Sequence, residues 1–244
     1  MFTSERHTAI LEILKENGSA VVKSLAKPLY VSEATVRRDL KEMQKMGLIE
    51  RSHGGAILPE TADEISIFVR MNKNAKEKER VATAALKILP EFKTLFVDSS
   101  STALALASRM DLTFKTVVTN NIQTAMNLAQ KPNLSLILLG GSVQYNTNSA
   151  TGSFTVRQLG EFSFDLMITS SASVSENEAL ERSLEQREIK RAAMLRSKRK
   201  ILLADHTKFG VSAPYKIAEL SEYDFVVTDM PPTDSDFEKI NLVY

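Results

Sequence analysis

The N-terminal quarter of the chain has apolar residues at helical spacing. They predict a helix over 4–16, a shorter helix over 21–29, and a third helix that begins after Ser32. Pro28 lies within the second of these and lacks an amide donor, so we expect that helix to be shortened or bent. Two helices followed by a short turn and a third helix are typical of the helix-turn-helix plan.

The third predicted helix has two different faces. Val36, Leu40 and Met43 fall on one stripe at about 100° per residue, so this side faces a core. Its remaining surface is polar and offers Ser32 as N-cap, Thr35, Arg37, Arg38 and Lys41. Guanidinium groups pair with phosphates and guanine edges, which predicts a helix that lies in the major groove of DNA. An ordinary solvated helix face is the alternative for an isolated arginine pair.

Residues 48–58 contain two short apolar segments around Gly54-Gly55. This pattern predicts a β-hairpin, and a hairpin that follows a helix-turn-helix is a wing. Arg51 and His53 lie in the predicted wing. The segment therefore extends a predicted DNA-binding domain to residues 1–58.

The pattern changes twice beyond the wing. Residues 59–75 are first acidic and then aliphatic, which predicts a linker that packs partly against one domain. Residues 76–244 alternate aliphatic strand segments with helical ones. The predicted strands are 94–97, 116–118, 134–139, 166–168, 200–203 and 225–227, and the predicted helices are 75–89, 102–110, 122–130 and 180–197. The fold class is therefore an α/β domain with a mostly parallel sheet, preceded by a small winged helix-turn-helix domain.

Polar residues follow most of the predicted strands. The carboxyl ends of parallel strands meet at one edge of a sheet, where ligands commonly bind. The candidate ligand residues there are Asp98, Ser99, Ser100, Ser101, Thr102, Thr119, Asn120, Gly140, Gly141, Asp205 and Lys208. Hydroxyls and free amides at the start of a helix favour an anion such as phosphate.

Composition and charge restrict the function only weakly. The net charge is +1, with 43% hydrophobic and 25% charged residues, as in ordinary globular proteins. Residues 1–58 hold nine Lys and Arg against seven Asp and Glu, which gives +2, so DNA binding depends on where the basic residues lie. Absence of cysteine and of a long apolar run suits a cytoplasmic protein without a membrane segment. The three histidines are far apart in the sequence, and none has a carboxylate residue at the spacing typical of metal ligands. We therefore predict no metal and no cofactor.

The N-terminal motifs together resemble the DNA-binding domain of the DeoR family of bacterial transcriptional regulators. The resemblance rests on Glu5-Arg6, Val31-Ser32, the run Thr35-Val36-Arg37-Arg38-Asp39-Leu40, Gly47-Leu48, Arg51 and His53-Gly54-Gly55-Ala56. It implies that Thr35, Arg37 and Arg38 contact double-stranded operator DNA and that Arg51 and His53 act in the wing.

The second half resembles the DeoR effector domain, which is similar in fold to ribose-5-phosphate isomerase and senses a phosphorylated sugar in many members. The matching positions are the loop at Asp98, Thr119-Asn120, Gly140-Gly141, Gly152, Asp165, Glu188 with Lys190-Arg191, and Asp205 with Lys208-Phe209-Gly210. The resemblance adds Glu188 to the candidate ligand residues. Two segments depart from the family pattern: Ser100 stands where the family usually has glycine, and residues 169–173 lack a glycine.

Three functions are compatible with these patterns. The first is a DNA-binding regulator, a homodimer or homotetramer that represses sugar-metabolism genes and responds to a phosphorylated sugar. The second is a regulator whose second domain only forms oligomers. The third is a sugar-phosphate isomerase with Asp165, Glu188 or Lys208 as acid and base, which the glycine-free segment 169–173 disfavours.

Overall fold

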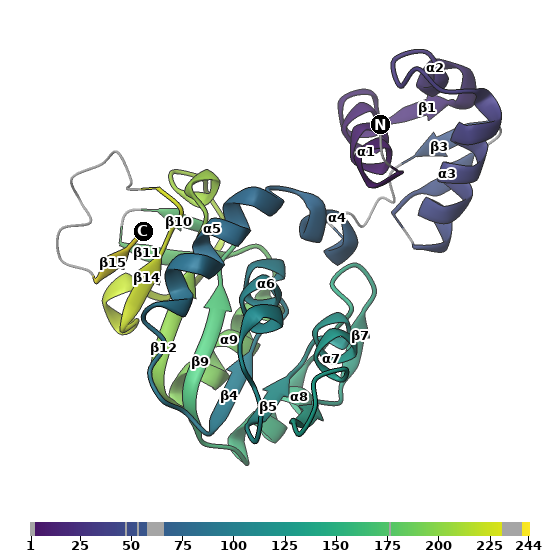
Figure 1. The fold of residues 1–244 in the computed structure, drawn as a ribbon. Helices are drawn as coiled ribbons and strands as arrows, with labels where there is room; N and C mark the ends of the chain where they lie inside the picture. Colours follow the sequence, from purple (N-terminus) through teal and green to yellow (C-terminus); the bar gives the residue numbers. More distant parts are fainter. Residues whose placement is uncertain (1–2, 47, 53, 58–65, 176, 231–240) are drawn as a thin grey trace. The chain divides into compact units, whose positions relative to one another are not determined.

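The computed structural model describes residues 3–46, 48–52, 54–57, 66–175, 177–230 and 241–244. The chain divides into two compact units, residues 1–73 and 74–244 (Figure 1). Each unit has its own hydrophobic core, and each is described separately below.

Unit 1 is a small helical domain with a three-stranded antiparallel sheet. Its elements are α1 (Thr3–Asn17), β1 (Ser19–Val21), α2 (Val22–Ala26), α3 (Glu33–Lys45), β2 (Glu50–Ser52), β3 (Gly55–Ile57) and α4 (Ile67–Asn72). The sheet order is β1-β3-β2, so the predicted hairpin is confirmed and β1 adds a third strand that the sequence patterns did not indicate. Ile10, Leu14, Leu25, Val36 and Leu40 are fully buried in the core between these elements.

The second helix is shorter than the predicted range 21–29, as expected for a segment that contains Pro28. It ends at Ala26, and Pro28 lies beyond it in a turn, so the proline neither bends the helix nor interrupts it. Lys27, directly before the proline, keeps helical backbone angles (φ −66°, ψ −56°), and the left-handed Tyr30 (φ +53°) then takes the chain out of the helical path.

The predicted linker falls partly outside the described residues, which resume at Ser66. Residues 67–72 form α4, and Val69 of this helix is buried in the core of unit 1. Two aliphatic residues of this segment, Ile67 and Val69, are therefore buried.

Unit 2 contains a seven-stranded sheet in the order β15-β14-β12-β9-β4-β5-β6, and every pairing within it is parallel. The strands are β4 (Thr94–Val97), β5 (Thr116–Thr119), β6 (Ser135–Leu138), β9 (Phe164–Ser170), β12 (Ser197–Leu203), β14 (Phe225–Val227) and β15 (Leu242–Val243). All carboxyl ends of these strands consequently lie at one edge of the sheet. The predicted α/β architecture with a mostly parallel sheet is confirmed.

Helices cover both faces of this sheet (Figure 1). One face packs against α5 (Ala75–Leu86), α6 (Ser101–Arg109) and α7 (Ile122–Leu128). The other packs against α8 (Ser153–Gly160) and α9 (Leu184–Leu195). Alternate residues of one strand serve the two cores: Val97 faces the first and Phe96 the second.

Two smaller sheets were not predicted. β7 (Ser142–Gln144) pairs with β8 (Ser149–Thr151), and β10 (Ser173–Ser175), β11 (Glu178–Glu181) and β13 (Tyr215–Glu219) form an antiparallel sheet. The predicted helix over 180–197 was wrong at its start, because residues 178–181 belong to β11 and the helix begins only at Leu184. Within the described residues, no helix has the length and apolar character needed to cross a membrane.

Candidate nucleic-acid interface and ligand site

Helix α3 starts with the cap that the sequence predicts. The Ser32 hydroxyl accepts a hydrogen bond from the Thr35 backbone amide at 3.1 Å and lies 3.0 Å from the Thr35 hydroxyl. Ser32 therefore satisfies one of the first free amides of the helix, and the two hydroxyls lie together at its N-terminal end.

The outward face of α3 is available to a partner. Arg37 is exposed and pairs with Glu33 at 3.1 Å, an interaction between neighbours on one helix turn. Arg38 and Lys41 are also exposed, and neither forms an ion pair with any residue that the structure describes. Two cations on this face thus have no competing internal partner.

Asp39, by contrast, serves the fold. It is buried, and its two carboxylate oxygens accept hydrogen bonds from Arg6 Nε and Nη2, each at 2.8 Å. This bidentate pair fastens α1 to α3 on the side opposite the exposed arginines. The arginine and aspartate motifs that carry the family resemblance therefore form an internal anchor for α3.

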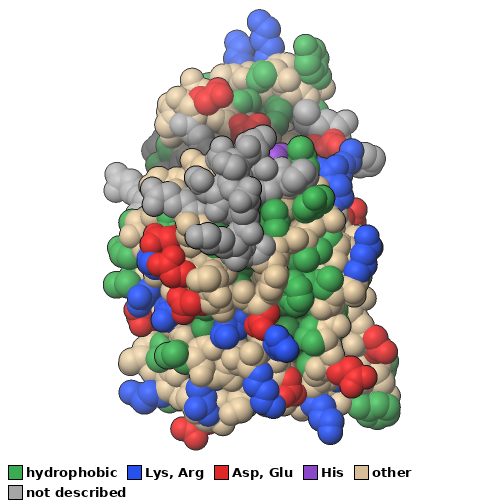
Figure 2. Space-filling model, turned by 90° about the vertical axis from the view of Figure 1, so that its left-hand side faces the viewer, with side chains coloured by type: hydrophobic (Ala, Val, Ile, Leu, Met, Phe, Trp, Pro, Cys, Tyr) green, Lys and Arg blue, Asp and Glu red, His purple; other side chains and the backbone are tan. Residues whose placement is uncertain are grey.

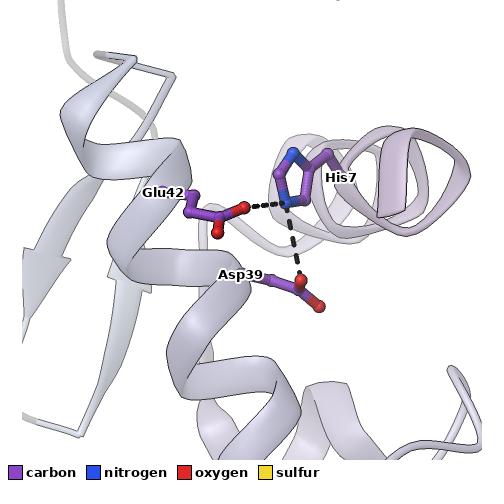
Figure 3. Close-up of side chains that lie close together, drawn as sticks. All are labelled: His7, Asp39 and Glu42. Atoms are coloured by element: carbon purple, nitrogen blue, oxygen red, sulfur yellow. Dashed lines mark ion pairs between the residues drawn. The ribbon is translucent and has the colours of Figure 1, made fainter. Parts of the chain in front are cut away.

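His7 completes this cluster (Figure 3). Its Nε2 lies 3.6 Å from Asp39 and 4.0 Å from Glu42. Burial lowers the pKa of His7, and the attraction of the two carboxylates only partly opposes this effect. The sequence places no carboxylate at ligand spacing from a histidine, but tertiary contacts bring Asp39 and Glu42 to His7, and Asp229 to His206.

The His7, Asp39 and Glu42 ligand atoms are close enough together to consider a metal ion. Both Asp39 oxygens already bind the Arg6 guanidinium, so a cation there would displace or repel a permanent positive charge. The donor set fits an ion-pair network better than a metal centre.

The wing depends on a close approach between strands. A Cβ on Gly55 would lie 2.2 Å from the backbone oxygen of Ala20, so only glycine lets β3 pair with β1 at this point. Arg51 lies on β2 with its Nε buried and without a hydrogen-bond partner among the described residues. The other predicted wing residue, His53, lies outside the described residues.

In unit 2, Asp98 is the centre of a buried polar cluster at the carboxyl end of β4. Its carboxylate accepts hydrogen bonds from the Ser100 hydroxyl at 2.6 Å, the Thr169 hydroxyl at 2.7 Å and the Ser170 amide at 3.2 Å. Lys190 lies 3.1 Å away. Burial alone would raise the pKa of Asp98, but Lys190 and the hydroxyl donors outweigh it and lower the pKa.

Lys190 holds two carboxylates at once. Its Nζ lies 2.6 Å from Glu181 and also donates to the Ser170 backbone oxygen. The lysine and both carboxylates are buried. Burial would lower the pKa of Lys190, yet Glu181 and Asp98 together raise it to about 12. The three charges sum to −1 and tie α9, β11 and β4 together.

Gln186 extends the cluster to the neighbouring hairpin. It accepts a hydrogen bond from the Ser99 hydroxyl at 2.7 Å and donates to the Ser149 hydroxyl at 2.7 Å. The sequence patterns indicated neither Gln186 nor Glu181, since each acquires its partners only through tertiary contacts.

Ser100, at the position where the family usually has glycine, fits the loop without strain. Its φ is −83°, its hydroxyl caps α6 by accepting from the Ala103 amide at 3.1 Å, and it donates to Asp98. The loop therefore does not need glycine's backbone freedom here. Ser101 and Thr102 follow as the first two residues of α6, and both are buried.

The remaining candidates lie mainly at the same sheet edge. Thr119 and Asn120 are buried at the end of β5, and Asp205 is buried after β12. Lys208 donates hydrogen bonds to the Ser170 hydroxyl at 2.8 Å and to the Ser171 backbone oxygen. Gly140 and Gly141 follow β6, where a Cβ on Gly141 would lie 2.0 Å from the Thr155 hydroxyl.

Glu188 is not brought to this cluster. It is exposed on α9 and pairs with Arg187, its neighbour in the chain, whereas the buried side of the same helix carries Gln186 and Lys190. Residues two positions apart on a helix point in nearly opposite directions. This explains why Glu188 is exposed while Lys190, which also belongs to the family pattern, is buried.

Three neighbouring strands of this sheet are each followed by a buried polar atom without a hydrogen-bond partner in the described structure. They are Asn120 Oδ1 after β5, Thr102 Oγ1 after β4 and Ser171 Oγ after β9. Buried polar groups in folded proteins are nearly always satisfied by protein, water or ligand. Unused hydrogen-bonding capacity is thus present after each of these three adjacent strands.

The exterior of unit 2 carries both signs of charge. Figure 2 shows Lys, Arg, Asp and Glu side chains interspersed over the face that carries β14 and β15. Among the described side chains of this face, neither sign dominates, in agreement with the net charge of +1.

A winged helix-turn-helix unit followed by an α/β unit with a polar strand-end cluster defines a DNA-binding regulator with an attached sensor domain. The DeoR-like helix-turn-helix domain model matches residues 6–62, and the DeoR C terminal sensor domain model matches residues 73–230. The chain therefore belongs to the DeoR family, and it is a transcriptional regulator rather than an enzyme.

Curated relatives extend over nearly the whole chain. The HTH-type transcriptional regulator GolR of Listeria innocua is 33% identical over 94% of this chain and 91% of its own. The glycerol-3-phosphate regulon repressor of Escherichia coli is 32% identical over 95% of this chain and 93% of its own. Among solved structures, ribose 5-phosphate isomerase A from Methanocaldococcus jannaschii matches 56% of this chain and 55% of its own with 14% identity and a TM-score of 0.41.

Proposed function

We propose that this regulator is a cytoplasmic repressor of sugar-metabolism genes whose binding to operator DNA is controlled by a phosphorylated sugar or polyol. In this proposal the outward face of α3 and the wing contact DNA, and the carboxyl edge of the parallel sheet binds the effector. The effector changes DNA affinity only if it binds one arrangement of the protein better than the other.

The DNA contacts are assigned to Ser32, Thr35, Arg37, Arg38, Lys41, Arg51 and His53. Arg38 is the strongest candidate for a base contact. It is exposed on the opposite side of α3 from the buried Val36 and Leu40, and it has no ion-pair partner among the described residues. An arginine in the groove contacts guanine through two hydrogen bonds, which are worth about 1–3 kcal/mol against a wrong base.

The observation that carries the effector proposal is the row of unsatisfied buried atoms on Thr102, Asn120 and Ser171. A sugar hydroxyl can donate to the Asn120 oxygen and accept from the two hydroxyls. The first amides of α6, at Ser101 and Thr102, lie at the positive end of a helix dipole, which favours a phosphate group there. The relative named for a glycerol-3-phosphate regulon supports phosphate esters as the first class to test.

Oligomer formation is also proposed, through a second copy of this chain. Strand β6 is an edge of the sheet, so one side of its backbone has no partner strand in the described structure. Exposed apolar side chains lie on and around this edge, namely Met126, Leu138, Val143, Tyr145 and Phe154. An edge that pairs with its own copy around a two-fold axis would cover both features.

The first experiment tests DNA binding with duplexes selected by the wild-type protein from a random-sequence pool. Arg38→Ala should weaken binding by roughly 1–3 kcal/mol, about 5- to 150-fold, with little change in thermal stability. Lys45→Ala, an exposed change at the other end of α3, is the matched control. Wild-type affinity in both Arg37→Ala and Arg38→Ala would refute the groove assignment.

The second experiment tests the effector by thermal shift against a panel of sugar and polyol phosphates with the unphosphorylated compounds as controls. A ligand at 100 times its Kd should stabilise the sensor unit by about 2.7 kcal/mol. Lys208→Ala and Ser101→Ala should remove this shift and the release of DNA while preserving DNA binding itself. Release of DNA by the same ligand from both variants would place the effector elsewhere.

A further inference from the structure

Tyr30 lies in the turn between α2 and α3, and its side chain is almost entirely in solvent. The residue is 95% exposed, more than any other large hydrophobic residue among those the structure describes. Leu29, its neighbour in the turn, is buried in the core of unit 1. The ring of Tyr30 therefore contributes no comparable burial to the fold.

The backbone at Tyr30 would be better served by glycine. Its φ is +53°, in the left-handed region. The Tyr30 amide donates to the Lys27 oxygen and the Val31 amide to the Ala26 oxygen, at 3.3 and 3.2 Å. This pair of bonds is the Schellman pattern that ends a helix, in which the left-handed residue is usually glycine. A tyrosine here costs stability through its Cβ and gains none from packing.

The position relates Tyr30 directly to the DNA-facing surface. Tyr30 precedes Ser32, the cap of α3, by two residues. In a helix-turn-helix the N-terminal end of the recognition helix, here α3, contacts base edges. Residues 19–32 contain Lys23 and Lys27 but no Asp or Glu, and both lysines are exposed. The next residue, Glu33, is exposed but pairs with Arg37, so the charges around this turn favour a polyanion as the partner of the exposed phenol.

We propose that Tyr30 is an additional DNA contact whose hydroxyl donates a hydrogen bond to a backbone phosphate beside the groove that α3 enters. A phenol is long enough to reach past the backbone of the turn and has a single strong donor at its tip. This inference rests on the proposed placement of α3 in the groove. It explains why the turn keeps a costly exposed aromatic residue where glycine would fold better.

The test compares Tyr30→Phe and Tyr30→Gly in binding to the selected duplex, together with their thermal unfolding. Tyr30→Phe should unfold at the wild-type temperature and bind several-fold more weakly, because only the hydroxyl is lost. Tyr30→Gly should unfold at a higher temperature and yet bind at least as weakly. A tyrosine with a purely structural role would not give a variant with a higher unfolding temperature and a lower affinity for DNA.

Salt dependence separates this contact from a charged one. Lys27→Ala should reduce the slope of log K against log salt by about one unit if Lys27 also faces phosphate, whereas Tyr30→Phe should leave the slope unchanged, since no counterion is released by a neutral donor. Wild-type affinity in Tyr30→Phe would overturn the phosphate contact. Arg38→Ala in the same assay tests the placement of α3 in the groove. If Arg38→Ala binds the duplex more weakly while both Tyr30 variants bind like the wild type, only the Tyr30 contact is rejected.

Discussion

The buried lysine of the sensor unit offers a strong test of its energetics. Lys190→Met keeps most of the side-chain volume but removes the charge that Asp98 and Glu181 share at 3.1 and 2.6 Å. Both carboxylates are buried, and removal of one partner from a buried ion pair costs about 3–5 kcal/mol, because uncompensated charge remains. For a unit of this size, 1 kcal/mol shifts the melting temperature by about 2–4 °C, so we expect a decrease of roughly 6–20 °C.

The matched control is the next residue of the same helix. Arg191 pairs with Glu222 at 3.0 Å, but the arginine is 30% and the glutamate 43% exposed. Surface pairs of this kind contribute at most about 1 kcal/mol. Arg191→Met should therefore lower the melting temperature only slightly, as measured by calorimetry of the full chain. Equal effects of the two substitutions would refute the assigned role of Lys190.

The pH dependence of stability gives a second, independent test of the role of Lys190. In the wild type, the lowered pKa of Asp98 contributes stability above the unfolded pKa of a carboxyl group, and this contribution is lost as the pH falls. In Lys190→Met, burial without the ammonium raises the pKa of Asp98, so the folded variant gains a proton as the pH falls. The difference in stability between wild type and variant should shrink from pH 7 toward pH 5. A difference that grows over this range would contradict the proposed electrostatics.

Three further predictions concern other parts of the chain. Burial lowers the pKa of His7, so the folded state binds fewer protons than the unfolded state. The free energy of unfolding of unit 1 should therefore fall as the pH decreases below about 6.5. His7→Gln should flatten this pH dependence in urea titrations at several pH values. Gly55→Ala should destabilise unit 1 by roughly 1–3 kcal/mol in urea, because its Cβ meets the Ala20 oxygen at 2.2 Å, and a cost near zero would show that β1 can move away. Leu138→Lys should shift sedimentation toward the monomer with an unchanged circular dichroism spectrum, and an unaltered assembly would exclude the β6 edge as the contact.

The sequence predicted the architecture well where periodicity carries the information. Strands 94–97 and 225–227 were placed at their observed bounds, because short aliphatic runs between polar turns have few alternatives. The start of α9 was misplaced because Ala179 and Leu180 fit a helical stripe as well as an alternating strand, and only pairing with β10 and β13 decides between them.

The polar clusters were predictable only in part. The position of Asp98 at a strand end was evident from the chain, as was the outward direction of Arg38 on α3. The partners of Asp98 were not, because Thr169 and Lys190 lie far away in sequence and are brought together by the pairing of β4 with β9 and the packing of α9. Glu188 shows the converse problem: a match to a family position does not say which side of a helix faces inward.

The anchoring of Asp39 by Arg6 has a consequence for genetic work on this regulator. Asp39 adjoins two exposed arginines in the sequence, so on the proposed placement of α3 in the groove we expect a screen for variants that no longer occupy an operator to return changes at all three positions. Changes at Asp39 would act by loosening α1 from α3, and the cell would then hold less intact protein. Quantifying protein abundance beside reporter output separates variants that misfold from variants that have lost only recognition.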